Sequence, residues 1–415
     1  MAEQETVITE QAFDIVISGG GLSGSLMALS LATLFQTQQK KLKIAIIEAT
    51  AINKDIALTY DDRVLALSHG TASYLQQLGV WQLMSNNATA IKNIHISDRG
   101  HYGKARLSAD DYGVSALGFV IEMSLIGKAL YQCLAEYKQQ VTWFTPDSIE
   151  KIDWQQKNVN ITLTSGKKLS ANLLLGCDGA QSRCRQLANI DSSSCDYQQS
   201  ALIANVTCQY HHQGKAFERF TEYGPIAMLP MSSFGKNNSA KGRCSLVWTL
   251  PPEQAKQLAA LNENDFSTAL TESFGTWLGK VTSVGKRDIY PLKLVQAKEQ
   301  IYHRMALIGN ALHTIHPIAG QGFNLGVRDV KQLAALISQT LDKNKNADLG
   351  AWQLLTQYQQ QRAKDLQQVI ALTDSLVTLF SNQLPPLVMG RNIGLKVLNY
   401  CTPLKKILVQ KTMGY

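Results

Sequence analysis

The chain has 415 residues, of which 45% are hydrophobic and 17% charged, and its formal net charge is +8. This composition predicts a globular protein of roughly two domains, because one hydrophobic core rarely grows to this length. The charge is moderate and comes without an RNP-type motif or a long run of Lys and Arg, which disfavours nucleic acid as a partner.

Cysteine usage and the hydropathy of the chain bear on its location. Seven cysteines are scattered without a CxxC pair, which favours a reducing cytoplasm over an oxidising compartment or a zinc site. The polar start, MAEQETVITEQ, does not have the pattern of a signal peptide. The sequence contains no run of about 18 uncharged apolar residues, which is the pattern that would predict a membrane span. We therefore expect a cytoplasmic protein without a metal site.

The first predicted element is a strand over residues 13–18 that leads through GGGLSG into an Ala- and Leu-rich helix. This is a GxGxxG pattern in which Gly19 permits the turn, Gly21 lets a pyrophosphate approach and Gly24 lets helix and strand pack closely. The phosphates would lie at the helix N-terminus. The next apolar run ends at Glu48, placed as expected for a ribose contact. The pattern leaves FAD and NAD(P)H as alternatives, beside a glycine-rich corner without a ligand.

Two later segments combine glycines with polar residues at the ends of predicted strands. Asp178 and Gly179 follow the apolar run ANLLLG and precede Ser182 and Arg185. Alone, this pair also fits an ordinary Asp-Gly turn with a helix cap. Further on, LIGNALHTIHPIAGQGFNLGVRDV crowds glycines around a proline between a predicted strand and a predicted helix.

In this order, the three segments resemble class A flavoprotein monooxygenases. In that family the Asp-Gly turn lies near the pyrophosphate and the approach of the nicotinamide donor, and the last segment binds the ribityl chain and covers the isoalloxazine ring. The resemblance implies FAD as cofactor and NAD(P)H as co-substrate. The helix N-terminus would favour negative charge on the reduced flavin by about 0.3–1 kcal/mol, and up to about 2 kcal/mol when partly buried. The implied flavin contacts in the last segment are Gly309, Asn310, Pro317, Gly320, Gln321, Gly322 and Asn324.

Asn310 departs from the family's usual Asp. Its amide oxygen can still accept a ribityl hydroxyl, but a negative charge beside the flavin is lost. Gly-Asn before HPIAGQGFNLGVRDV, together with DDRVLALS, IHISDRG and GPIAMLP, resembles the ubiquinone-biosynthesis hydroxylases. Among them it is most similar to the subgroup that hydroxylates 2-octaprenyl-6-methoxyphenol at ring position 4. This resemblance spans nearly the whole chain and implies a polyprenylated phenol as substrate.

The implied fold is α/β, with a Rossmann-like FAD-binding domain of the para-hydroxybenzoate hydroxylase type, an inserted β-sheet substrate domain and a C-terminal helical region. The strands expected in SALIANVTC, GPIAMLP and RCSLVWTL would roof the flavin and exclude water. We assign residues 1–85, 110–190 and 298–372 to the FAD-binding domain, 86–109 and 191–297 to the substrate domain, and 373–415 to the C-terminal segment.

The implied reaction needs an acceptor for the phenol proton. NAD(P)H reduces FAD, O2 adds at flavin C4a as a hydroperoxide, and a ring carbon of the phenol attacks the distal oxygen. His313 and His316 are candidates for the acceptor, with a structural loop histidine as the alternative for each. Arg63 is a candidate contact for the FAD pyrophosphate or the donor, with a solvated surface Arg as the alternative. The sequence shows no second GxGxxG between a predicted strand and a predicted helix, so NAD(P)H would bind without a domain of its own.

The end of the chain is basic, with five Lys or Arg residues from Pro385 onward and no acid after Asp374. Apolar residues lie beside these basic ones in the sequence. The combination allows three interpretations: peripheral contact with the inner face of the cytoplasmic membrane, docking to a ubiquinone-biosynthesis protein complex, or a helix packed on its own domain. For the whole chain, the alternatives are hydroxylation at another ring position, hydroxylation of another phenol, and a flavin-binding component without turnover.

Overall fold

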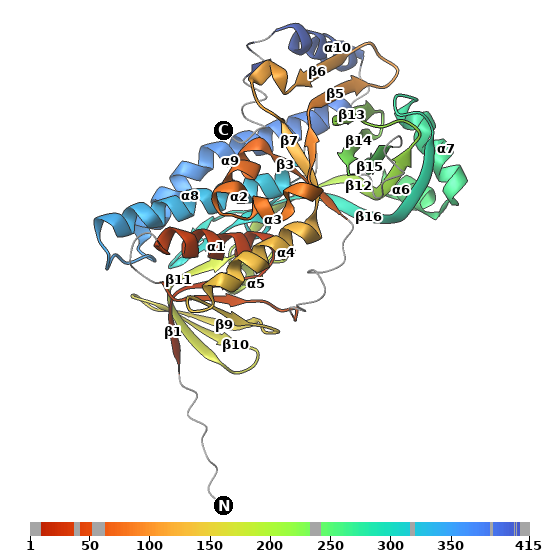
Figure 1. The fold of residues 1–415 in the computed structure, drawn as a ribbon. Helices are drawn as coiled ribbons and strands as arrows, with labels where there is room; N and C mark the ends of the chain where they lie inside the picture. The colour runs from red at the N-terminus through yellow and green to blue at the C-terminus, as the bar shows by residue number, and fades with distance from the viewer. Residues whose placement is uncertain are drawn as a thin grey trace, which may run out of the picture.

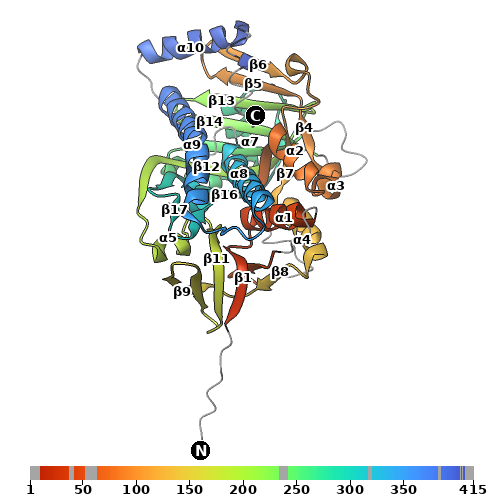
Figure 2. The same cartoon turned by 90° about the vertical axis from the view of Figure 1, so that its left-hand side faces the viewer.

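The computed structural model describes residues 10–36, 42–51, 63–232, 242–315, 320–381, 385–401, 403 and 405–406. Two large sheets meet at an angle, and long helices run alongside both (Figures 1 and 2). Among the described residues, none of the helices combines the length and the apolar character needed to cross a membrane.

The first sheet contains the strand that leads into the glycine motif. Its strands are β1 Gln11–Ser18, β2 Ile44–Ile47, β8 Val141–Phe144, β9 Ile149–Trp154, β10 Val159–Leu163, β11 Lys168–Gly176, β17 Ile301–Tyr302 and β18 Met305–Leu307. The order β18-β11-β1-β2-β8 is parallel throughout. The antiparallel β9-β10 hairpin extends β11, and β17 pairs antiparallel with β18.

Both faces of this sheet are covered, which explains its nearly continuous apolar strands. All four residues of β2, for example, are buried. One face carries a core shared with the helices, including Leu29, Leu130 and Ile337. The other face packs against the β9-β10 hairpin. The helices of the chain are α1 Leu22–Gln36, α2 His69–Gln77, α3 Trp81–Met84, α4 Met123–Leu134, α5 Arg183–Leu187, α6 Pro252–Ala260, α7 Glu263–Phe274, α8 Gln321–Lys343, α9 Trp352–Ser381 and α10 Pro385–Tyr400.

The second sheet forms the other half of the molecule. Its strands are β5 Asn93–Asp98, β6 Lys104–Ser108, β12 Ser192–Cys208, β13 Lys215–Thr221, β14 Gly224–Met231, β15 Gly242–Leu250, β16 Val281–Ala297 and β19 His313–Thr314. Their order is β19-β16-β12-β15-β14-β13-β5-β6, antiparallel except for the parallel pair β13-β5. Helices α6 and α7 pack on one face through a core that includes Phe266, Leu270 and Trp248.

Several predicted elements are confirmed. The three stretches expected to be strands lie in β12, β14 and β15, and the helix predicted at the end of the third glycine-rich segment is α8. Strand β3 Val64–Ser68, with β7 Gly118–Glu122 and β4 Thr89–Ile91, forms a third sheet between the two larger ones. Helix α9 runs without a break through residue 373, where we place a domain boundary.

Candidate active site

A cavity of about 1050 Å³ lies between the two large sheets. On one side are the carboxyl ends of β1, β2 and β11, where open parallel sheets usually bind ligands. On the other is the face of the second sheet that α6 and α7 leave uncovered. Ligand pockets commonly measure about 300–1,000 Å³, so this cavity has room for a large cofactor and part of a substrate. Eleven residues predicted to bind cofactor line it: Gly19, Gly21, Glu48, Arg63, Asp178, Gly179, Asn310, Gly320, Gln321, Gly322 and Asn324.

The turn between β1 and α1 has the geometry expected of a nucleotide-binding loop. Gly19 has φ +95°, and a Cβ there would lie 2.5 Å from the Cys177 carbonyl oxygen. A Cβ on Gly24 would lie 1.8 Å from the Gly19 carbonyl oxygen, so this glycine closes the turn behind the cavity. A Cβ on Gly21 would meet no atom within 4 Å, which leaves its backbone open to a ligand.

Glu48 holds its carboxylate at the edge of the cavity. One oxygen accepts a hydrogen bond from the Gly20 N–H (2.7 Å), and the other accepts one from the Thr50 N–H (2.9 Å). The side chain that would contact a ribose is therefore tied to the glycine turn itself.

The turn after β11 contains a buried carboxylate oxygen with unused hydrogen-bonding capacity. Asp178 Oδ2 accepts from the Cys184 N–H (2.9 Å), whereas Oδ1 is buried and has no hydrogen-bond partner among the described residues. The Ser182 hydroxyl caps α5 by accepting from the Arg185 N–H (3.0 Å). The Arg185 guanidinium donates to the Ala311 carbonyl (2.9 Å), so it joins this turn to the one that carries Asn310.

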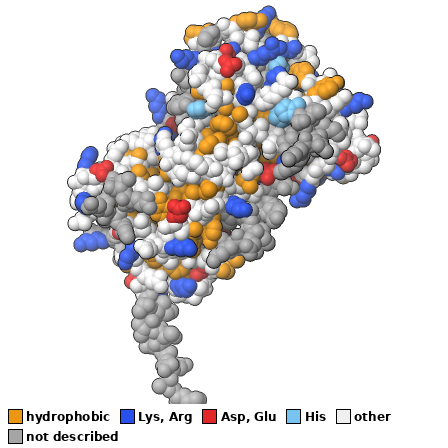
Figure 3. All heavy atoms as spheres, in the orientation of Figure 1, with side chains coloured by type: hydrophobic (Ala, Val, Ile, Leu, Met, Phe, Trp, Pro, Cys, Tyr) orange, Lys and Arg blue, Asp and Glu red, His pale blue; other side chains and the backbone are white. Residues whose placement is uncertain are grey.

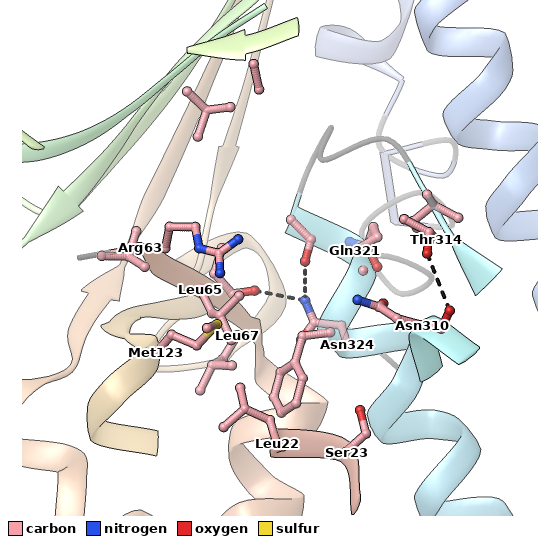
Figure 4. A pocket seen from close by; sticks show the side chains of 18 of the residues that line it. Leu22, Ser23, Arg63, Leu65, Leu67, Met123, Asn310, Thr314, Gln321 and Asn324 are labelled. Atoms are coloured by element: carbon pink, nitrogen blue, oxygen red, sulfur yellow. Dashed lines mark hydrogen bonds between the residues drawn. The ribbon is translucent and has the colours of Figure 1, made fainter. Parts of the chain in front are cut away.

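The third turn lies where α1 and α8 approach each other closely. Gly309 has φ +59°, and a Cβ there would lie 2.9 Å from Ser23 Oγ. Asn310 follows and lines the cavity. Figure 4 shows Asn310 and Gln321 on one side of the cavity and Arg63 on the other. The Arg63 guanidinium lies 5.0 Å from the centre of the Tyr290 ring, which also lines the cavity.

Asn324 contacts the cavity but uses its side-chain atoms within the protein. Its Oδ1 accepts from the Ser68 N–H (2.9 Å), and its Nδ2 donates to the carbonyls of Ala66 (2.8 Å) and Gly320 (2.7 Å). It joins β3 to the start of α8, as the dashed lines in Figure 4 show for Nδ2. These contacts favour a positioning role toward a bound flavin.

His313 is buried and is not among the residues that line the cavity. Its Nε2 lies 2.9 Å from Asp329 Oδ2, which favours the structural alternative for this histidine. His316 and Pro317 lie outside the described residues.

Asp329 is fully buried and was missed by the sequence analysis, although helical spacing places it with Leu325 and Leu333 on the core face of α8. It also accepts from the Gly309 N–H (3.0 Å) and from Arg362 Nε (2.8 Å). Burial alone would raise the pKa of its carboxyl, but His313, Arg362 and the Gly309 N–H lower it below the usual value. This ion network supports the turn before Asn310 from behind.

Glu218 was also missed. It lies on β13 and lines the cavity from the side of the second sheet. Burial raises the pKa of its carboxyl to about 7. Among the described residues, no group of three or more His, Cys, Asp or Glu side chains is arranged to hold a metal ion.

The residues of the first half fit a dinucleotide cofactor. Open backbone at Gly21, a fixed carboxylate at Glu48 and the turn at Asp178 line the same cavity. Residues 12–373 match the family described as FAD binding domain. The chain belongs to this family of FAD-dependent monooxygenases. FAD is its cofactor.

Relatives of this monooxygenase extend over its whole length. It is 32% identical to ubiquinone hydroxylase UbiL of Rhodospirillum rubrum, over 98% of this chain and 90% of the relative. It is 31% identical to the 3-demethoxyubiquinol 3-hydroxylase of Escherichia coli, over 98% of this chain and 100% of the relative. The predicted resemblance to the ubiquinone-biosynthesis hydroxylase group is thereby confirmed.

The fold of the monooxygenase is also found among solved structures. The crystal structure of p-nitrophenol 4-monooxygenase PnpA from Pseudomonas putida superimposes with a TM-score of 0.76, covering 98% of this chain and 99% of that one, at 17% identity. The predicted fold class, an FAD-binding α/β domain with an inserted sheet and C-terminal helices, is confirmed.

Proposed function

We propose that this monooxygenase hydroxylates the ring of a polyprenyl methoxyphenol in ubiquinone biosynthesis, using NAD(P)H and O2. The observation that carries the proposal is the polarity of the cavity. The end of the cavity at the carboxyl ends of β1, β2 and β11 contains the residues that would bind the dinucleotide. The opposite, second end is apolar and is lined by Ile94, Ile96, Leu107, Phe220 and Leu395. A phenol with a long hydrocarbon chain would place its ring between the two ends and bury its chain at the second. The names of the relatives support the pathway.

Bound FAD supplies the two-electron activation of O2 that no amino-acid side chain performs. The residues of the chain would bind and orient it. Gly21, Glu48 and Asp178 would hold the nucleotide part, and the N–H groups at the start of α8 would face the flavin, where the helix end favours negative charge. The second sheet would exclude water from the reacting atoms.

Anaerobic stopped-flow reduction by NADPH, with and without a short-chain prenyl methoxyphenol, tests this proposal. We expect faster flavin bleaching with the phenol and, after 18O2 is admitted, one labelled oxygen in the product. NMR of the product would identify the ring position that is hydroxylated. A product hydroxylated at another ring position would favour the alternative regiochemistry. Turnover of unprenylated phenols alone would point to another substrate class. Bound flavin that stays oxidised with either pyridine nucleotide and every phenol would support a component without turnover.

We further propose that α10 attaches the enzyme to the inner face of the cytoplasmic membrane. The inner side of the helix is anchored to the second sheet: Arg391 donates to both oxygens of Asp98 (2.9 and 3.3 Å), and Asn392 accepts from the Gly103 N–H (2.7 Å). Leu395 packs against Ala105 and reaches the apolar end of the cavity.

The outer side of α10 presents an apolar stripe to solvent. Its residues recur at helical spacing and are 45–77% exposed: Met389, Ile393, Val397 and Tyr400. Basic residues lie beside them, including Lys396 on the helix, and Figure 3 shows hydrophobic and basic side chains together at this end of the molecule. An apolar stripe with flanking cations matches the surface of an anionic bilayer, where each Lys or Arg contributes about 1 kcal/mol.

Vesicle flotation tests the attachment. We expect the protein to float with phosphatidylglycerol-containing vesicles and less with pure phosphatidylcholine, and Ile393→Asp to abolish flotation. Leu83 on α3 is also 45% exposed, so Leu83→Asp is the matched control and should float normally. Equal flotation of both variants with the wild type would overturn the proposal. Absence of flotation by the wild type would do the same and would favour docking to a protein complex.

A further inference from the structure

Glu218 lies in a cross-strand row of the second sheet that is otherwise apolar where it lines the cavity. The row ends at Asp288 of β16, which pairs with Lys286 and is not among the residues that line the cavity. In the strand register it lies beside Ile96 of β5 on one side and Ala227 of β14 on the other. The row continues through Val247 and Ile203. All five side chains line the cavity, and Glu218 is the only one of them that can ionise.

The carboxylate has no hydrogen-bond or ion-pair partner among the described residues. The other charged residues of β13 lie against rings, with Lys215 over Phe217 and Arg219 over Trp277. On the neighbouring β5, His95 packs against the same two rings.

Charged groups on the elements packed around β13 are paired elsewhere or exposed. On β5, Asp98 binds Arg391 of α10. On α9, Asp365 binds Arg328 and Arg362. Lys104 and Arg106 of β6 are exposed. Glu218 is half-buried and lines the cavity. A ligand in the cavity is therefore the available partner for the carboxylate.

Other acidic groups of the cavity are occupied or lie at the nucleotide end. Glu48 accepts from Gly20 and Thr50, and Asp147 accepts from Thr164 and Ser165. Asp178 belongs to the turn after β11. On the wall formed by the second sheet, which would face the substrate, Glu218 is the carboxylate among the described residues that line the cavity.

We propose that Glu218 is the catalytic residue that accepts the hydroxyl proton of the phenol substrate. This inference rests on the proposed function. The phenol O–H bond breaks and its proton passes to a Glu218 carboxylate oxygen. The electron pair stays on the phenolate oxygen and is delocalised into the ring, which makes the ring carbon nucleophilic. After the carbon binds one oxygen atom of O2, it loses its hydrogen as a proton. NAD(P)H supplies two of the four electrons that reduce O2, and the ring carbon supplies the other two. The second oxygen atom takes up two protons and leaves as water.

The acidity of Glu218 suits this task. A phenol has a pKa of about 10, and an ordinary glutamate is a poor match for it. Burial raises the pKa of Glu218 to about 7. The pKa difference between the phenol and the carboxyl is therefore smaller, while a large fraction of the carboxyl stays ionised at neutral pH. Proton transfer to a well-placed base contributes about 10²–10⁴-fold to a rate.

The experiment compares FAD-loaded wild type, Glu218→Gln and Glu222→Gln with a short-chain prenyl methoxyphenol between pH 5.5 and 9. Glu222 is an exposed glutamate just after β13 and is the matched control. For the wild type and the control, we expect kcat/KM to fall on the acid side with a pKa of about 7. Glu218→Gln should lose about 100-fold or more in kcat and lose this acid limb. More of the NAD(P)H it consumes should yield H2O2 in place of product.

The flavin content and circular dichroism of Glu218→Gln report its folding. If that variant does not fold, Glu218→Asp serves, because it keeps a carboxylate: it should retain an acid limb at a reduced rate. A Glu218→Gln enzyme that hydroxylates the phenol with wild-type kcat and pH profile would overturn the inference and leave the proposed function standing. A wild type that hydroxylates no phenol would overturn the proposed function, and the inference with it.

Discussion

The two ends of the cavity are built in different ways. At the nucleotide end, backbone atoms approach one another so closely that Gly19, Gly24 and Gly309 have no room for a Cβ. A buried ion network centred on Asp329 supports this end from behind. At the substrate end, side chains of an ordinary antiparallel sheet point into the space, and nearly all are apolar.

This difference indicates how each end recognises its ligand. A pyrophosphate is bound by backbone N–H groups, so the chain must hold a single backbone geometry there. A hydrocarbon chain is bound by the area it buries, without directional contacts, so many apolar residues would serve. The nucleotide end should therefore tolerate substitution poorly, and the substrate end should tolerate it well except at Glu218.

The largest effect is expected at the glycine turn. Gly24→Ala places a Cβ 1.8 Å from the Gly19 carbonyl oxygen, so it should prevent folding of the nucleotide-binding half and yield insoluble protein. Gly21→Val points into open space and should fold but retain no FAD, because its side chain occupies the position of the pyrophosphate. Flavin absorbance and circular dichroism of the purified variants separate the two outcomes. A yellow Gly21→Val protein with normal flavin content would contradict the assignment.

Asp329→Asn should have the next largest effect. It removes the charge opposite buried Arg362, and breaking a buried pair costs about 3–5 kcal/mol of unfolding free energy. Because the pKa of Asp329 is lowered in the folded protein, its stabilisation is present above the ordinary carboxyl pKa and is lost as pH falls through the lowered one. Urea unfolding at pH 7 and pH 3 should show the deficit shrinking at the lower pH, which lies below the ordinary carboxyl pKa. Asp288→Asn, in an exposed pair with Lys286, should cost under about 1 kcal/mol.

Asn310→Asp should preserve flavin content and lower the flavin reduction potential. A negative charge beside the ring disfavours the added electrons. Spectroelectrochemical titration measures the potential, and Asn310→Ser, which stays neutral, is the control. An unchanged potential in the Asp variant would mean that Asn310 does not lie beside the ring.

The smallest effect is the pH dependence of stability at Glu218. Its raised pKa means that the folded protein binds a proton more tightly than the unfolded chain, so stability falls as pH rises from the ordinary glutamate value through about 7. Glu218→Gln removes this penalty. Its Tm relative to the wild type should be higher at pH 8 than at pH 5, by on the order of 2 °C. A difference that is independent of pH would place the carboxylate in solvent.

The sequence by itself determined the fold class, the family and the residues that meet at the nucleotide end. That was possible because short-range rules are strict there: a tight turn, a phosphate-binding helix end and a ribose carboxylate each require particular residues at particular spacings. Glu48, Asp178 and Gln321 are more than 100 residues apart from one to the next, yet each belongs to such a local pattern, and all three line one cavity.

Tertiary structure alone decided the roles of Asn324, Asp329 and Glu218. The side chain of Asn324 is used by backbone groups of β3, 256 residues earlier in the chain. Asp329 is one of several charged residues on its helix, and only packing buries it between His313 and Arg362. Glu218 lies in a strand whose residues face the two sides of the sheet in the usual alternation, so nothing in the local sequence distinguishes it. Burial and pairing depend on which distant elements surround a side chain, and local sequence does not encode them.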